Sequence, residues 1–337
     1  MEQVQPLGPH PLALDSVWVQ GASAEGAWLV AGVARRPRRQ LDAVCLVGVP
    51  GLGTLKLPRH PDTLLVASND VFGGEGLLIR LVEPMVCWKI NYAGPMRLDE
   101  TGELVDVVLD LTFTSTLPCF DFDTDMAPRT VARAMAREPW SREFFARLRD
   151  AHQTHYEQIG TTRGRVTVRG REYALSVTGM RDHSFAARRD WRLLHRYALH
   201  TIVTEDDVRA QVGVVSQPYS FSRIELGYVH TPEGTLEALE WCDLELGYHG
   251  EQGDDPWDYG FSFGAASRTY HVLVEVRERQ ELFCGREWEA RLLERPCRYQ
   301  VNGVTGWGMS EWYYRHEAGR PAAYPCEEPA LGQGHEQ

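Results

Sequence analysis

The stretch Val105-Asp106-Val107-Val108-Leu109-Asp110-Leu111-Thr112-Phe113 places an apolar side chain at every odd-numbered position. Asp106, Asp110 and Thr112 stand between them. Side chains that repeat with a period of two lie on one face of a β-strand. A strand with one apolar and one polar face covers a core on one side only. The stretch therefore predicts a half-buried strand whose odd-numbered residues point into an apolar core.

The same alternation recurs on both sides of this stretch, at residues 86–92 and 270–276. The chain also contains 31 Gly, 13 Tyr and 10 Trp, a mixture that suits pleated surfaces joined by tight turns. Many short strands of this kind predict a mostly β, antiparallel sandwich or barrel. Further strands are expected near residues 27–33, 41–48, 63–67, 76–82, 164–168, 171–177, 192–202, 207–215, 221–227, 235–246, 259–263, 286–294 and 304–314.

One helical segment interrupts the expected strands. Residues 126–153 are rich in Ala, Arg, Glu and Phe, and Pro139 should break the helix. We place the boundary between two β domains directly after this segment, which then bridges or covers them. The expected organisation is an N-terminal domain of residues 16–155, a C-terminal domain of residues 156–320, and loose tails at 1–15 and 321–337.

The composition excludes several function classes. The 337 residues are 43% hydrophobic and 24% charged, with a formal net charge of -12. An acidic chain is poorly suited to follow a phosphate backbone, so no nucleic-acid partner is expected. The sequence has no run of about 18 apolar residues, so no membrane span is expected. Residues 1–6 do not resemble a secretory signal, and a cytoplasmic location is expected.

The residues that bind metals are not grouped in the sequence. The seven Cys are scattered and form no Cys-x-x-Cys pair, which argues against a disulfide framework and a structural zinc site. Residues 121–125 resemble the start of a calcium loop, but Met126 and Ala132 replace its turn Gly and bidentate Glu. His152 and His155 are expected to form a surface pair on a helix. We therefore expect no metal site.

The segment Gly179-Met180-Arg181-Asp182-His183-Ser184-Phe185-Ala186-Ala187-Arg188-Arg189-Asp190-Trp191 concentrates charged side chains between two expected strands. In an extended chain Asp182 and Ser184 point one way and their odd-numbered neighbours the other. Buried charges are costly unless they pair, so the cluster is either a structural network or a catalytic site. In the catalytic interpretation, His183 beside Asp182 carries a proton near neutral pH.

Residues 299–312 form a second distinctive stretch. Asn302-Gly303 is a strong hairpin signal. Gly306 and Gly308 leave room on one face for a neighbouring backbone or a ligand. Glu311 lies near the end of a buried strand, where it either pairs with an Arg of the charged segment or acts as an acid.

Residues 180–185 resemble the Asp-His-acidic/polar-Trp-Gly signature of the AttH-like and carotenoid 1,2-hydratase-like (hydroxyneurosporene synthase-like) superfamily. Residues 76–94 resemble its first-half signature, and residues 303–311 resemble its closing hairpin. Residues 156–158 and 164–168 resemble the lead-in seen in its uncharacterised members. The resemblance implies two lipocalin-like β-barrels in tandem, which hold small apolar ligands inside and need no organic cofactor. Members of this superfamily include carotenoid hydratases and pericyclases.

In the hydratases, the His and the aromatic residue of this signature contribute to the active site, and they match His183 and Phe185 here. The sequence departs from the pattern at two positions. Phe185 stands for the signature Trp and lacks its indole N–H donor. Ala186 stands for the following Gly and alters the expected pocket mouth.

These observations predict a protein that holds a small apolar, lipid- or isoprenoid-like molecule in a barrel pocket, with cofactor-independent hydratase, isomerase or cyclase chemistry as an extension. The alternative is a non-catalytic interaction protein that keeps the barrels. The sequence does not indicate the ligand or the oligomeric state. The expected catalytic residues are Asp182 and His183, and the expected pocket residues are Trp88, Arg181, Phe185, Trp191, Trp307 and Glu311.

Overall fold

The computed structural model of the chain describes residues 2–68, 70–248, 255–266 and 268–325. Its first sheet closes on itself, because β9 pairs with both β8 and β11. The closed ring runs through β11 (Thr154–Val168), β12 (Arg171–Ala186), β1 (Leu14–Ala22), β2 (Trp28–Arg35), β3 (Gln40–Val49), β4 (Gly53–Lys56), β8 (Cys87–Leu98) and β9 (Leu104–Thr114). Short strands flank it: β5 (Leu64–Val66), β6 (Phe72–Gly74), β7 (Leu77–Glu83) and β10 (Phe120–Asp121).

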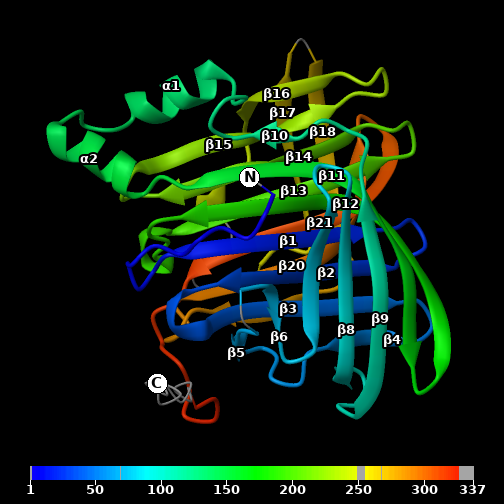
Figure 1. Cartoon of the computed structure of the whole chain (residues 1–337). Helices are drawn as coiled ribbons and strands as arrows, with labels where there is room; N and C mark the ends of the chain where they lie inside the picture. Colours follow the sequence, from blue (N-terminus) through cyan, green and yellow to red (C-terminus); the bar gives the residue numbers. More distant parts are fainter. Residues whose placement is uncertain (1, 69, 249–254, 267, 326–337) are drawn as a thin grey trace.

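A second sheet closes in the same way, since β20 pairs with both β18 and β21. The described part of the chain thus forms two antiparallel barrels in tandem, which confirms the predicted fold class (Figure 1). The second ring runs through β13 (Arg196–Thr204), β14 (Arg209–Gln217), β15 (Phe221–His230), β16 (Leu236–Cys242), β17 (Asp258–Ala265), β18 (Arg268–Val276), β20 (Ala290–Val301) and β21 (Val304–Arg315), with β19 (Gln280–Cys284) on β20.

The expected domain boundary needs a correction. β11 and β12 belong to the first barrel, where they join β9 to β1. The boundary predicted between residues 155 and 156 therefore falls inside β11, and the chain changes sheets between Ala186 and Arg196. Without β11 and β12 the first barrel would have two open edges, which leave backbone groups unpaired.

The N-terminal residues are not a loose tail. Glu2 is only 5% exposed, and its carboxylate accepts a hydrogen bond of 2.9 Å from Arg181 inside the first barrel. Asp15 is fully buried in β1. At the other end, Tyr324 packs on Trp288 with ring centroids 5.0 Å apart. Residues 326–337 of the expected C-terminal tail lie outside the described residues.

The expected helical segment forms two helices, α1 (Pro128–Ala136) and α2 (Arg142–Asp150), with Pro139 between them. Ser141 begins α2 by accepting a hydrogen bond from the Phe144 backbone N–H. The helices follow β10 of the first barrel but lie beside β15 of the second, to which Arg133 is tied through Glu225 at 2.7 Å (Figure 1). They form the predicted bridge. No described helix is long and apolar enough to cross a membrane.

The alternation that opened the sequence analysis is realised in β9. Its odd-numbered residues from Val105 to Phe113 are at most 4% exposed, and Val108 on the other face is 51% exposed. β2 and β3 do not alternate, because their outer faces pack against the second barrel. In that interface Val30 and Leu46 share a cluster with Leu292. Strands buried on both faces are expected to read as continuous apolar runs.

The hairpin predicted at Asn302-Gly303 joins β20 to β21, and both residues have the positive φ that such a turn requires. Gly306 and Gly308, which follow the hairpin, allow the backbone of the neighbouring strand to approach closely. A Cβ on Gly308 would lie 1.9 Å from the Thr201 carbonyl oxygen, and one on Gly306 2.7 Å from that of Val203. The room left by these glycines is therefore taken by the neighbouring strand β13.

Candidate functional site

A cavity of about 410 Å³ lies between the two barrels, where outward-facing side chains of β1 and β12 meet those of β13 to β15. Residues of α2, of the segment that follows it (151–153) and of the segment before α1 complete its wall. Most of the lining is apolar, and examples from the different walls are Val44, Phe122, Leu148, Leu199, Val215 and Leu226. A pocket of this size with an apolar lining and a few polar groups is typical of small-molecule sites.

Four of the polar groups of this cavity lie on β11 and β12. His155 lies directly opposite Ser184, and Glu157 lies directly opposite Asp182. All four line the cavity. Residues two apart on a strand share a face, so the antiparallel register alone brings these side chains into one group. We call these four residues the polar wall.

Asp182 is the member of the polar wall with the most perturbed acidity. Its Oδ1 is buried and accepts a hydrogen bond from no described residue. Burial raises the pKa of Asp182 to about 7, with a further contribution from the carboxyl groups of Glu157 and Glu311. The positive charges of His155 and Arg181 oppose the shift. A carboxylic acid with this pKa holds a proton near neutral pH and can deliver it.

His155 lies between two partners. Its Nδ1 is 2.6 Å from the Ser184 hydroxyl, and its Nε2 is 3.1 Å from Glu157 Oε1. Burial alone would lower the pKa of His155, but the hydrogen bond to Glu157 and its negative charge outweigh burial and raise it. The Phe122 ring covers the imidazole at a centroid distance of 4.7 Å. The expected surface pair with His152 is wrong, because His155 belongs to β11 and not to a helix.

The second barrel faces the polar wall with a pair of acids. Glu311 lines the cavity, lies opposite Glu294 in the β20–β21 register, and accepts a hydrogen bond from Tyr197. Burial raises the pKa of both carboxyl groups, and the charge of Glu311 raises that of Glu294 further. Among the described residues Glu311 forms no ion pair with an Arg of segment 181–189. Arg189 lines the same cavity, and its positive charge lowers the Glu311 pKa, so both interpretations of Glu311 stay predictions.

His183 points away from the cavity, into the first barrel. Its Nε2 lies 2.8 Å from Asp15 Oδ1 and its Nδ1 2.9 Å from the Tyr156 hydroxyl. Tyr156 donates in turn to Glu2 at 2.6 Å. Successive residues of a strand face opposite sides, so the structure separates the two expected catalytic residues, Asp182 and His183.

The interior of each barrel holds a buried charged cluster beside its apolar core. In the first, Arg181 pairs with Glu2 and lies 5.4 Å from the centroid of the Trp88 ring. In the second, Arg295 pairs with Asp255 at 3.0 Å and lies 4.8 Å from the centroid of the Trp312 ring. The candidate ligand site is the cavity between the barrels.

The remaining expected pocket residues are dispersed. Trp191 lines the cavity between the barrels. Trp88 and Arg181 lie inside the first barrel, as described above. Phe185 borders a separate hollow and contacts the His183 ring at 5.6 Å. Trp307 packs in the apolar interface between the barrels and is absent from the described lining of the cavity.

Sequence reasoning missed His155, Glu157 and Tyr197. The signal available was the His155-x-Glu157 spacing, which puts both side chains on one face of a strand. It was missed because the boundary between the two domains was placed between residues 155 and 156.

Within the described residues, no three His, Cys, Asp or Glu side chains are grouped as a metal site.

The chain matches a known protein family. A family model covers residues 1–314 of the chain. The chain belongs to DUF8627, a family of unknown function. No curated protein matches the sequence.

Solved structures share the fold of this DUF8627 chain. A crystal structure from Nitrosomonas europaea, assigned as AttH, has a TM-score of 0.59 at 11% identity, over 94% of this chain and 100% of its own. Kievitone hydratase from Nectria haematococca has a TM-score of 0.55 at 11% identity, over 89% and 88% of the two chains. CghA with Sch210972 has a TM-score of 0.55 at 10% identity, over 90% and 89%. The resemblance predicted from the sequence is confirmed at the level of the fold.

The raised pKa of Asp182 predicts a stability effect. The folded state holds this proton up to about pH 7, whereas an unfolded Asp releases it near pH 4. The stabilisation is therefore complete below pH ~4 and is lost as the pH rises to about 7. Asp182→Asn should raise the melting temperature by ~2 °C or more at pH ~8 and change it little at pH ~4. Calorimetry at the two pH values measures this, and a variant that melts lower at pH ~8 would contradict it.

Proposed function

We propose that this protein binds a small, mainly apolar molecule in the cavity between its barrels and transfers a proton to it from Asp182. The reaction class is cofactor-independent hydration, isomerisation or cyclisation at a carbon–carbon double bond. The observation that carries the proposal is the position of the Asp182 carboxyl group. The residue is half-buried, its Oδ1 is buried without a hydrogen-bond partner among the described residues, its pKa is about 7, and it lines a mainly apolar cavity.

The proton balance of the proposed reaction is simple. The π electrons of the double bond take the proton of Asp182, which leaves a carboxylate and a carbocation. In a hydration, water then adds to the cation and its proton returns to Asp182. An acid of this kind works best in a site from which bulk water is excluded.

The fold neighbours support this choice of reaction class. One is named as a kievitone hydratase, and another was solved with a small molecule, Sch210972. The identities of 10% and 11% leave the substrate of this chain open. The mainly apolar lining, with acids on two facing walls, favours a molecule with an apolar body and one polar end.

Occlusion of the cavity tests the binding step. Leu199→Trp should fill the space between the barrels and weaken binding of a fluorescent apolar probe at least ~10-fold, or about 1.4 kcal/mol. Val108→Trp, on the exposed face of β9, is the matched control and should bind as the wild type does. Fluorescence titration measures both. Equal binding by Leu199→Trp and the wild type would place the ligand elsewhere.

Turnover is tested with a panel of prenylated phenols and open-chain polyenes in deuterated water. A substrate should acquire deuterium at carbon, and a hydration product should also gain the mass of one water. Mass spectrometry reads both changes. If no panel member binds in competition with the apolar probe or acquires deuterium, the proposal fails.

A further inference from the structure

The polar wall contains a second chemical arrangement that the proposed proton transfer does not use. Ser184, His155 and Glu157 form a chain in which the imidazole lies 2.6 Å from the hydroxyl and 3.1 Å from the carboxylate. Ser184 is 6% exposed and Glu157 is 1% exposed, and both line the cavity. A nucleophile, a base and an acid that orients the base are the parts of a serine hydrolase triad.

The barrel holds these three side chains in place. His155 and Ser184 are direct cross-strand partners in the β11–β12 register, and Glu157 follows on the same face. Glu157 accepts from the Nε2–H of His155, which leaves the Nδ1 lone pair directed at the Ser184 hydroxyl. The Phe122 ring limits rotation of the imidazole. The base is therefore oriented before any substrate arrives, which is the condition for activating a hydroxyl.

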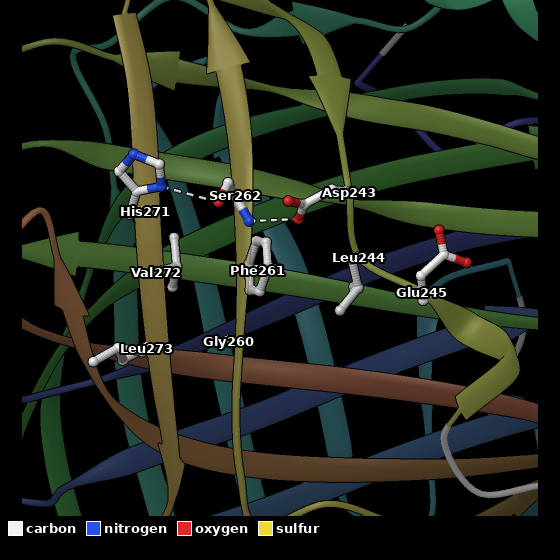
Figure 2. A pocket seen from close by; sticks show the side chains of 9 residues that line it. All are labelled: Asp243, Leu244, Glu245, Gly260, Phe261, Ser262, His271, Val272 and Leu273. Atoms are coloured by element: carbon white, nitrogen blue, oxygen red, sulfur yellow. Dashed lines mark hydrogen bonds between the residues drawn. The ribbon is translucent and has the colours of Figure 1, made fainter.

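A second Ser–His contact in the same chain provides an internal comparison. On the outside of the second barrel, Ser262 Oγ lies 3.0 Å from His271 Nδ1 in an open hollow (Figure 2). The nearby Asp243 accepts the backbone N–H of Ser262 and does not reach the imidazole. No described carboxylate contacts His271. This pair lacks the orienting acid and the enclosure that surround Ser184.

The geometry points to Ser184 as a nucleophile toward esters of apolar acids, activated by His155 and Glu157. Its hydroxyl proton passes to His155 Nδ1 while Oγ bonds to the ester carbonyl carbon, whose π electrons move to oxygen. Collapse breaks the carbon–oxygen bond to the alcohol, which leaves with the proton from His155. Water then gives a proton to His155 and attacks the acyl group, and Ser184 recovers its proton as the acid is released.

Stabilisation of the oxyanion limits the rate of this reaction. Ser184 lies within a strand paired on both sides, to β1 and to β11. A side chain can supply a donor. Trp18 lies on β1, diagonal to Ser184. Its indole N–H is buried and donates to no described residue. One such donor is worth roughly 100-fold to 1,000-fold in rate. Acyl transfer to Ser184 should therefore be easier to detect than fast ester turnover.

An alkyl fluorophosphonate tests the inference on the full chain. It should form a 1:1 adduct that peptide mapping places on Ser184, and Ser184→Ala should abolish the adduct. His155→Gln should slow labelling about 100-fold or more, as expected for loss of a general base. Ser262→Ala is the matched control and should be labelled like the wild type. Melting temperatures of all variants show that each is folded.

The test separates this inference from the proposed function. Asp182→Asn should keep the fluorophosphonate adduct, because the triad does not include Asp182. Labelling that spares Ser184, that occurs equally on Ser262, or that is unchanged in a folded His155→Gln variant would overturn the inference and leave the role of Asp182 unaffected. If Ser184→Ala does not fold, the His155→Gln rate and the mapped site decide the question.

Discussion

Arg181→Met should lower the free energy of unfolding by about 3–5 kcal/mol, because it removes one partner of a fully buried ion pair. Arg181 is 0% exposed and donates to Glu2 at 2.9 Å and to Gln158 at 3.1 Å. Its guanidinium also lies 5.4 Å from the centroid of the Trp88 ring. Met fills much of the space, but it leaves the Glu2 carboxylate buried without its counter-charge. Urea unfolding followed by tryptophan fluorescence measures the loss.

Two further variants identify the cause of this effect. Arg169→Met breaks the exposed pair with Glu103, whose side chains are 58% and 55% exposed, and should cost about 0–1 kcal/mol. The double variant Glu2→Gln with Arg181→Met should be more stable than the sum of the single losses predicts, since no charge is then left unpaired. If Arg181→Met lowered the free energy of unfolding no more than Arg169→Met does, the N-terminal residues would not stabilise the first barrel.

The fold could be predicted from the sequence because the strands of an antiparallel barrel repeat the same alternation of apolar and polar residues. Residues 105–113 alternate along their whole length, and the structure buries one face as expected. Alternation does not say which sheet a strand joins. β11 and β12 were assigned to the wrong barrel for that reason. The contact between Glu2 and Arg181 spans 179 residues, and a short polar N-terminal segment gives no local sign of it.

The candidate site could be predicted only in part. The pleat of an extended chain correctly separates Asp182 and Ser184 from their odd-numbered neighbours. The sequence could not say which face borders a cavity, because both faces of β12 are buried. One faces the interior of the first barrel and the other faces the second barrel. His183 was selected because it lies beside Asp182 and matches a signature residue, and the structure places it in the interior of the first barrel.

Asp182 faces the cavity and His183 faces the interior of the first barrel, so substitutions of these two adjacent residues should have opposite effects on turnover and stability. Asp182→Asn should fold normally and lower turnover of any substrate found by about 100-fold to 10,000-fold, as expected for a general acid. Since the acid must hold its proton, wild-type turnover should fall as the pH rises through about 7. The groups that set this value are His155, Glu157, Glu311 and Arg181.

His183→Ala should lower the stability of the fold and leave turnover per folded molecule unchanged. It leaves a cavity and unpaired polar groups between Asp15 and Tyr156, at a cost of about 2–4 kcal/mol, yet the folded fraction should keep its turnover. Turnover per folded molecule, with the folded fraction taken from circular dichroism, makes the comparison. Loss of turnover in His183→Ala with full activity in Asp182→Asn would move the chemistry into the first barrel. The opposite result places it between the barrels, because the backbone pleat permits only one of the two residues to reach the cavity.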